Sequence, residues 1–156
     1  MTPFSEIDNM FLSGIKDKTL LDFTEVERQQ MLDIWRNKAI TRFKACKKDL
    51  YDKVDTVYDV ETGEDDEEIV IMTVGYFNQT LTDEEKLIIA TIMKKYWLSD
   101  KIYSLELLKQ RMATKEWKLT SQAEHLLRLT VLNQELDKEI SRMIVSYTTY
   151  AYSIGE

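Results

Sequence analysis

The chain has 156 residues, and its 28 Asp and Glu against 21 Lys and Arg give a net charge of −7. This length fits one domain with a core of its own, and the 44% hydrophobic content is typical of a globular protein rather than a disordered tail. One Cys, one His, four Gly and one Pro exclude an internal disulfide and multi-Cys or His-pair metal sites, and point away from enzymes towards a helical interaction module.

The first half of the chain predicts two helices. The first runs from Pro3 to about Ile15, because apolar residues recur there every three or four positions. The second begins at Thr24, where Thr24 and Glu27 have the spacing of a capping box, in which each side chain satisfies a free backbone N–H. We expect this helix to continue without interruption along one apolar stripe: Met31, Trp35, Ala39, Phe43, Cys46 and Leu50. Its only thiol is expected to be a small core filler rather than a reactive group.

Six bases and no acid lie between Asp33 and Asp49, at the end of this second helix. They are Arg36, Lys38, Arg42, Lys44, Lys47 and Lys48. The negative end of a helix dipole favours cations in the last turns, so a solvated helix end is the simplest interpretation. A contact with an acidic neighbour or with nucleic acid remains the alternative.

Residues 51–77 break the helical pattern and predict an extended or β-hairpin arm. Residues that favour strands lie on both sides of a polar turn around Gly63. Residues 51–68 contain nine acids and one Lys, so the net charge of the whole chain resides here. Unpaired carboxylates are costly to bury, so the tip is expected to be solvated, to dock on basic groups or to face DNA and repel it. The tip acids are Glu64, Asp65, Asp66, Glu67 and Glu68.

Three further helices are predicted in the second half. The third begins at a capping box, Thr82–Glu85, and is apolar nearly all round, so we expect it to be central and to bury Ile89 and Met93. The fourth covers about 104–113. The fifth begins at Ser121 and runs to about Tyr150, and we expect it to bury Leu129 and Leu136. A helix of roughly thirty residues is roughly 45 Å long, so its C-terminal end is expected to project beyond a small bundle.

The C-terminal tyrosines Tyr147, Tyr150 and Tyr152 fit two interpretations. They continue the apolar stripe of the last helix, as core residues would, and Tyr also offers the large contact area with a polar tip that suits an interface. An aromatic stripe left in water would favour aggregation, so we assign residues 146–156, with Tyr147, Tyr150, Tyr152 and Ile154, to contact with a partner.

Motifs for chemistry or for membranes are lacking. Residues 59–63 faintly resemble a calcium loop, but Gly63 comes one place too early. His125 is interpreted as a surface or packing residue, and no nucleophile elbow, phosphate loop or dinucleotide fingerprint is found. The first ten residues do not form a signal peptide, and no apolar run approaches the about 20 residues of a membrane span. We therefore expect a soluble protein made in the cytoplasm, without catalytic residues, metal or cofactor.

The order of several segments resembles a known family. Residues 43–50 (FKACKKDL) and 81–90 (LTDEEKLIIA) are followed by Tyr96-Trp97-Leu98, 107–110 (LLKQ), 114–117 (TKEW) and 121–126 (SQAEHL), before a long helix that closes in tyrosines. Taken together, over roughly 20–150, these segments resemble the head–tail connector, or adaptor, proteins of tailed bacteriophages. The resemblance implies a structural protein and not an enzyme.

Members of that family are small helical bundles that form a ring, usually of twelve copies, beneath the portal at the capsid vertex. The resemblance therefore implies a virion neck protein whose ring extends the DNA channel. Its partners would be its own copies, the portal, the next neck or tail-completion protein, and genomic double-stranded DNA passing without sequence-specific binding. The portal contact would use the C-terminal tail, and the tip acids would face a neighbour or the channel.

The expected fold is thus mainly α. A single domain, 1–156, would contain a bundle of about five helices with the acidic arm at 51–77 and the interaction tail at 146–156. Two other functions remain open. One is a small acidic assembly chaperone or host-protein inhibitor. The other is a nucleic-acid-binding regulator that uses the basic second helix, although a compact helix-turn-helix is missing and the net charge is negative.

Overall fold

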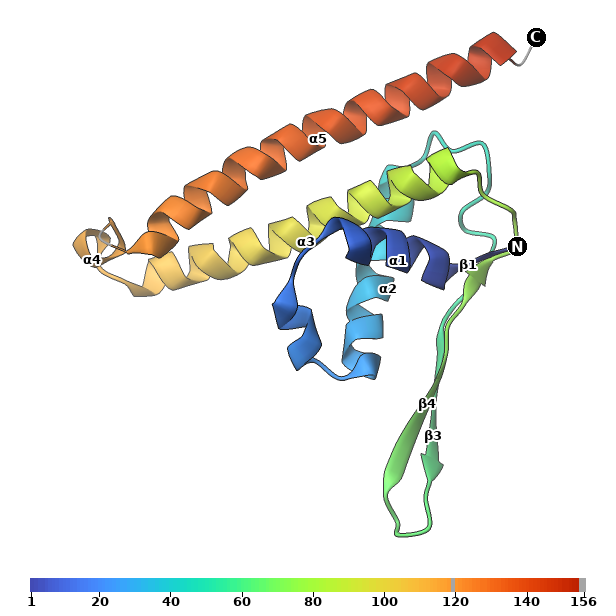
Figure 1. Cartoon of the computed structure of the whole chain (residues 1–156), viewed down its shortest axis with the longest axis horizontal. Helices are drawn as coiled ribbons and strands as arrows, with labels where there is room; N and C mark the ends of the chain where they lie inside the picture. The colour runs from blue at the N-terminus through green and yellow to red at the C-terminus, as the bar shows by residue number, and fades with distance from the viewer. Residues whose placement is uncertain (119, 155–156) are drawn as a thin grey trace. The chain divides into compact units, whose positions relative to one another are not determined.

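The computed structural model describes residues 1–118 and 120–154, with side chains described as far as Tyr150. The described chain is mainly α-helical, as predicted, and it adds two small antiparallel sheets. It divides into two compact units, Met1–Met93 and Lys94–Glu156, and one long helix, α3 (Asp83–Arg111), passes from the first unit into the second. Figure 1 colours these elements from the N-terminus in blue to the C-terminus in red.

The first unit opens with α1 (Phe4–Gly14), a 3-10 turn (Lys18–Asp22) and α2 (Glu25–Arg42). The apolar face predicted for the first helix is confirmed, since Phe4, Ile7 and Phe11 are buried. The capping box that was predicted for the second helix is also confirmed. The Glu27 backbone N–H donates to Oγ1 of Thr24 at 3.2 Å, and the Thr24 N–H donates to Oε2 of Glu27 at 2.9 Å.

The end of the second helix differs from the prediction. Helix α2 stops at Arg42, where the Phe43 N–H bonds to the carbonyl of Ala39, and residues 44–50 are irregular. Phe43 and Leu50 are still buried, so their helical spacing reflects burial in an irregular segment. Asp49 contributes to this irregular path, because its carboxylate accepts from the Tyr51 N–H at 3.0 Å, and such local bonds compete with helix formation.

Residues 51–77 form strands of two separate sheets. β2 (Lys53–Val54) and β5 (Tyr76–Phe77) join β1 (Thr2–Pro3) in a three-stranded sheet with the order β1-β5-β2. Between them, β3 (Val57–Thr62) and β4 (Glu68–Thr73) pair as an antiparallel hairpin that extends away from the helices of its unit (Figure 1). The predicted β-hairpin is therefore present, and its base is built into the fold at Phe77, whose buried ring meets that of Phe4 edge-on at 4.9 Å.

Gly75 is required at the base of the hairpin. A Cβ at this position would lie 1.9 Å from the carbonyl oxygen of Val54, which is far inside van der Waals contact. The carbonyl of Gly75 also accepts from the Phe4 N–H at 3.0 Å, where α1 begins. Only a residue without a side chain lets β2, α1 and the strand that leaves β4 approach each other this closely.

The second unit contains the rest of α3, a short helix α4 (Thr114–Lys118) and α5 (Ser121–Ile154). Separate third and fourth helices were predicted, and this was wrong, because α3 is continuous to Arg111. The polar residues between them stay helical: Ser99 and Ser104 bond back to the carbonyls of Lys95 and Asp100. Within this unit, Lys95 of α3 forms an ion pair with Asp137 of α5 at 2.6 Å.

The residues predicted to be buried are largely confirmed. Trp35, Phe43, Ile89, Met93 and Leu136 are buried, whereas Leu129 is half-buried. Helix α5 begins at Ser121 as predicted, but it reaches Ile154 rather than Tyr150. Leu132 lies between Leu129 and Leu136 in the apolar pattern of this helix but is exposed, so the buried face of the helix is narrower than its apolar sequence suggests.

Candidate functional site: the acidic hairpin and the last helix

The tip acids that the sequence singled out all lie in the loop of the β3–β4 hairpin or at its rim. Glu64, Asp65, Asp66, Glu67 and Glu68 are all exposed to solvent. The Gly63 N–H donates to the carbonyl of Glu67 at 2.8 Å, which leaves three residues to make the reversal. The exposure of these five side chains is expected, because burying unpaired carboxylates is costly.

The backbone strain of this turn lies at Asp66 and not at Gly63. Asp66 has a φ of 57°, the left-handed region, and it is the only non-glycine residue with positive φ among the described residues. A three-residue hairpin loop commonly places its last residue in this conformation, which Asp tolerates better than most side chains. The predicted turn around Gly63 is therefore present, and the structure adds that Asp66 is its left-handed residue.

The two strands expose apolar side chains on both faces. Opposed residues share a face in an antiparallel pair, so the register places Asp59 with Ile71 on one side and Val60 with Val70 on the other. Five apolar β-branched residues of the hairpin are between 41% and 61% exposed: Val57, Val60, Ile69, Val70 and Ile71. Two-stranded hairpins are marginal in water, and their unpaired edges and apolar faces favour contact with another chain. These features suit protein binding better than catalysis.

A partly buried polar cluster holds the base of the hairpin. Asp33 of α2 accepts hydrogen bonds from Tyr58 Oη at 2.6 Å and from Thr56 Oγ1 at 3.3 Å. It also accepts from Arg36 Nη1 at 2.7 Å and from Gln29 Nε2 at 3.1 Å. One carboxylate of α2 thus binds the hairpin and two residues of its own helix.

Arg36 joins this cluster to α1. Its guanidinium, 1% exposed, donates Nη2 to both carboxylate oxygens of Asp8, at 2.6 and 2.5 Å. The same group lies over the Phe4 ring, 4.1 Å from the centroid. A planar guanidinium with this combination of a two-oxygen contact and a stacked ring has little freedom to move. The position of α1 against α2 is therefore fixed by a buried charge pair.

The cluster shifts two pKa values. Burial raises the pKa of Asp8 above its ordinary carboxyl value, while the charge and hydrogen bonds of Arg36 and the hydrogen bond of Gln29 oppose that rise. Burial and then the hydrogen bond to Asp33 raise the pKa of Tyr58 far above its ordinary value of 10.0. Tyr58 is consequently a neutral donor to an acidic acceptor throughout the physiological range.

Sequence reasoning missed this cluster. Arg36 was counted with the basic run, whereas it is buried and paired with Asp8 and with Asp33. Lys48, from the same run, reaches the carboxylate of Glu85 at 3.4 Å and the carbonyl of Thr80 at 2.9 Å. The one usable signal was the spacing of Asp33 and Arg36, three residues apart on a helix, which favours an ion pair.

The last helix separates the tyrosines that were predicted to bind a partner. Tyr147 is buried, as the core interpretation expects, whereas Tyr150 is 64% exposed, as the interface interpretation expects. The side chains of Tyr152 and Ile154 lie outside the described residues. Because Tyr147 is buried in this structure, it is a packing residue here and offers little area to a partner.

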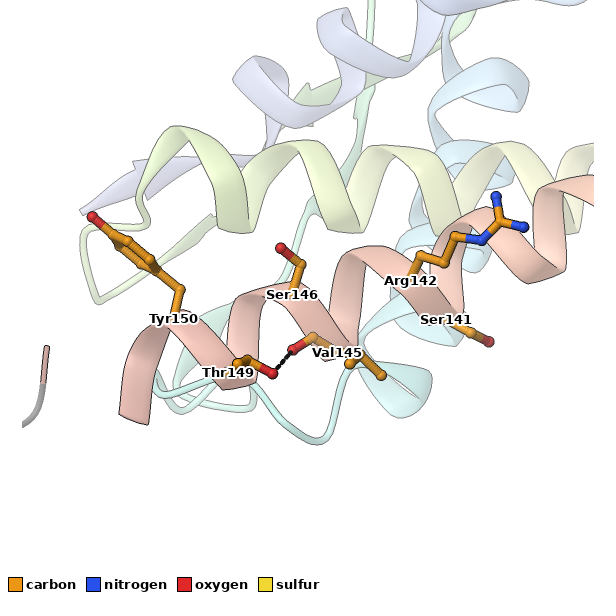
Figure 2. A pocket seen from close by; sticks show the side chains of 6 residues that line it. All are labelled: Ser141, Arg142, Val145, Ser146, Thr149 and Tyr150. Carbon is orange, nitrogen blue, oxygen red and sulfur yellow. Dashed lines mark hydrogen bonds between the residues drawn. The ribbon is translucent and has the colours of Figure 1, made fainter. Parts of the chain in front are cut away.

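An open hollow of about 600 Å³ lies along the same stretch of α5. The described residues that line it are Ser141, Arg142, Val145, Ser146, Thr149 and Tyr150. Figure 2 shows Tyr150 reaching outward from the helix, and the Thr149 hydroxyl bonded to the carbonyl of Val145 at 2.8 Å. With that hydroxyl satisfied within the helix, the exposed side chains of Val145 and Tyr150 offer apolar surface to a partner.

Neither a metal centre nor a membrane span is found in the described part of the chain. Among the described residues, no three His, Cys, Asp or Glu side chains come together in a way that could hold an ion. No described helix combines the length and the apolar character needed to cross a bilayer. His125 is exposed, and Cys46 is half-buried with its Sγ 3.8 Å from Oε2 of Glu85.

Comparisons of this chain with protein-family models, with curated proteins and with solved structures find no match. A functional proposal therefore rests on the residues themselves. These residues form an acidic hairpin that is anchored through Tyr58 and an outer helix face that includes Tyr150, and both surfaces suit contacts with other macromolecules.

Proposed function

We propose that this chain is a structural adaptor of a tailed-phage virion. In this proposal it forms a ring with copies of itself beneath the portal, extends the DNA channel, and joins the capsid to the neck or tail. The observation that carries the proposal is the hairpin at 57–73, which exposes seven acids and five Val and Ile side chains while its base is tied to α2 by Tyr58. The order of helical segments that resembles the connector family supports the same function.

The charge of the hairpin supports a role beside DNA rather than on it. Residues 57–73 carry no Lys or Arg, and binding to DNA is dominated by basic side chains that neutralise phosphate. Acidic tips repeated around a ring would repel phosphate and let the genome pass without adhering. The same charges would also attract a basic surface on a neighbouring protein and speed up its association.

In the proposal, the portal contact belongs to the C-terminal tail, 146–156. Tyr150 is its described anchor, because it is exposed beside the hollow on α5. Tyr147 keeps the helix packed instead of binding, since it is buried. Tyr152 and Ile154 complete the proposed contact. No residue in the proposal has a catalytic role, and no cofactor takes part.

The portal contact is tested with two variants of the full chain. Tyr150→Ser should weaken co-sedimentation with portal rings, whereas Tyr103→Ser, which changes an equally exposed tyrosine of α3, should not. A chain that lacks residues 146–156 should stay folded by circular dichroism and fail to join portal rings. Normal assembly of that truncated chain onto portals would place the contact elsewhere.

The assembly function is tested by mass measurement and by a DNA titration. The parent protein should form multimers by light scattering, alone or with portal rings, and should not retard duplex DNA at moderate salt. Tight DNA binding would favour the regulator interpretation instead. A protein that stays monomeric with portals and binds an unrelated folded partner would favour the chaperone or inhibitor interpretation.

A further inference from the structure

Both long edges of the hairpin are unpaired, since β3 and β4 form a sheet only with each other within the described part of the chain. The Gly63 N–H donates to the carbonyl of Glu67, so this pair is hydrogen-bonded, and bonded and non-bonded pairs alternate along an antiparallel ladder. The residues of the non-bonded pairs therefore direct their backbone N–H and C=O groups outward: Tyr58, Val60 and Thr62 on β3, and Glu68, Val70 and Met72 on β4. Each edge thus offers donors and acceptors to a further strand.

The two edges differ in charge. β3 carries Asp59 and Glu61 within the strand, whereas the only acid of β4 is Glu68, its first residue. Charged side chains and Pro are the usual protection of an edge strand, and residues 69–73 contain neither. Two β3 edges do not fit each other. Centred on Val60 they would place Asp59 opposite Glu61, and the next registers in phase would place Asp59 or Glu61 opposite its own copy.

The β4 edge fits the β3 edge of a second copy in the register that the hairpin itself uses. The outward backbone groups of Val70 then meet those of Val60 in the neighbouring copy, and within the two strands no acid lies opposite another acid. A shift by two residues, which keeps the backbone groups in phase, places acid opposite acid in either direction: Glu64 with Glu68, or Glu61 with Glu67. Charge therefore selects one register.

We propose that β4 of each copy adds to the β3 edge of the next copy, so that the hairpins of a ring form one continuous antiparallel sheet. The contact is head-to-tail, because it joins two different edges of the same protein, and such contacts close into rings when the rotation permits. A closed sheet has no free edge, and a two-stranded hairpin is only marginally stable without further strands. Main-chain hydrogen bonds supply the affinity, and the exposed side chains of Val60 and Val70 cover each other.

The sheet gives every hairpin of the ring the same direction. The tip acids at 64–68 then gather at one rim, as the proposed passage of DNA through an acidic channel requires. The inference rests on the proposed ring and names the contact that builds it.

Proline substitutions test the two edges separately. Val70→Pro removes an outward N–H of β4 and Val60→Pro removes one of β3, and neither takes a hydrogen bond from the ladder within the hairpin. Each should weaken assembly about tenfold or more in sedimentation velocity, alone or on portal rings. An equal mixture of the two variants should form dimers and nothing larger, because β4 of the Val60→Pro variant still fits β3 of the Val70→Pro variant.

The matched controls keep the backbone N–H and shorten the same side chains. Val60→Ala and Val70→Ala should each leave assembly within about threefold of the parent, because the main-chain hydrogen bonds remain. Circular dichroism and thermal midpoints check that all four variants fold. Equal losses in the alanine and proline variants would mean that the contact uses side chains and not the strand edges.

Disulfide trapping gives a test without proline. In the proposed sheet, Asp59 of one copy lies opposite Ile71 of the next in a non-bonded pair, with Cα atoms about 4.5 Å apart, which a disulfide can bridge. In a Cys46→Ser background, one pool carries Asp59→Cys and the other carries Ile71→Cys. Oxidation of the mixture should yield covalent dimers that neither pool forms alone. Ser13→Cys, at an exposed position of α1, replaces Asp59→Cys as the negative control.

The outcomes separate this contact from the proposed function. If the parent is multimeric and neither the prolines nor the trapping affect its assembly, the edge contact is wrong while the ring stands. If Val70→Pro weakens assembly, Val60→Pro does not, and the Ile71→Cys pool forms covalent dimers by itself, two β4 edges pair in a closed dimer and the proposed contact is wrong. If the parent stays monomeric alone and with portal rings, the contact and the ring are both wrong.

Discussion

Tyr58 donates its phenolic proton to Oδ2 of Asp33 at 2.6 Å and so ties the first strand of the acidic hairpin to the second helix. The acceptor is itself held by Arg36, whose guanidinium is buried against Asp8. The direction in which the hairpin leaves its unit therefore depends on a chain of polar contacts from α1 through α2 to β3. A surface that must reach a partner at a defined angle benefits from such an anchor.

Removal of the phenolic group tests this anchor. Tyr58→Phe should lower the free energy of unfolding by about 1–2 kcal/mol at neutral pH, because Asp33 loses one donor and keeps others. The measurement is urea unfolding followed by circular dichroism. Tyr76→Phe, at a half-buried tyrosine of β5, serves as the matched control and should change stability less. Equal losses in the two variants would mean that the hydrogen bond to Asp33 adds nothing.

The same tyrosine predicts a pH dependence. The pKa of Tyr58 is higher in the folded chain than the ordinary 10.0, so its stabilising contribution is complete below that value and declines as the pH rises above it. Above about pH 10 the parent should lose stability faster than Tyr58→Phe, by at most about 1.4 kcal/mol per pH unit. The difference between the two unfolding curves isolates Tyr58 from the other tyrosines. Parallel curves would contradict the assigned shift.

The buried ion pair makes Arg36 a sensitive position. Arg36→Met should cost about 3–5 kcal/mol, because Asp8 is left buried without its charged partner. Asp8→Asn/Arg36→Met should recover part of this loss, since the buried charge of Asp8 is removed, while Asp33 keeps its hydrogen bonds from Tyr58 and Gln29. Lys38→Met, at an exposed position of the same helix, should cost under about 0.5 kcal/mol. Chemical denaturation of the three variants measures the effect, and a loss in the double variant as large as in Arg36→Met would argue against an unpaired Asp8 as its cause.

Two glycines give a matched pair of backbone tests. Gly75→Ala should destabilise the protein by about 2–3 kcal/mol, because its Cβ would lie 1.9 Å from the Val54 carbonyl oxygen and strands would have to move apart. Gly14→Ala, where nothing lies within 4 Å of the added carbon, should be neutral or slightly stabilising. Thermal melting compares the two. Similar midpoints would mean that the base of the hairpin adjusts without strain.

The positive φ of Asp66 predicts that a glycine at this position makes the hairpin slightly more stable. Asp66→Gly should stabilise the hairpin by about 0.5–1 kcal/mol, because glycine adopts a φ of 57° without the steric cost that a side chain incurs. Asp65→Gly is the control: it removes the same charge at a residue without a positive φ, so it should not stabilise the hairpin. Hydrogen exchange of the β3 and β4 amides measures local opening. Faster exchange in Asp66→Gly than in the parent would contradict the prediction.

Local patterns in the sequence were sufficient for most helices. The buried faces of α1 and the capping box at Thr24 follow from spacing within a few residues, and both are present in the structure. The hairpin was also predictable, because strand-forming residues flank a polar turn. The errors concern helix ends, where the same local pattern is compatible with a helix that continues and with one that stops. Phe43 and Leu50 keep a helical spacing beyond the end of α2, and the polar residues near Ser99 do not end α3.

For the candidate surfaces, too, some features follow from the sequence and others only from the tertiary structure. The sequence alone determined that the net charge is concentrated in 51–68 and that its carboxylates must stay solvated or paired, since burial of unpaired charge is costly at any position. Only the tertiary structure decided that Arg36 leaves the basic run to bind Asp8, that Tyr147 is buried while Tyr150 is exposed, and that Asp33 holds the hairpin. Asp8 and Arg36 are 28 positions apart and Asp33 and Tyr58 are 25 apart, and such contacts arise only when helices and strands pack. Spacing along the chain determines which face of an element is apolar, whereas packing determines which polar groups meet.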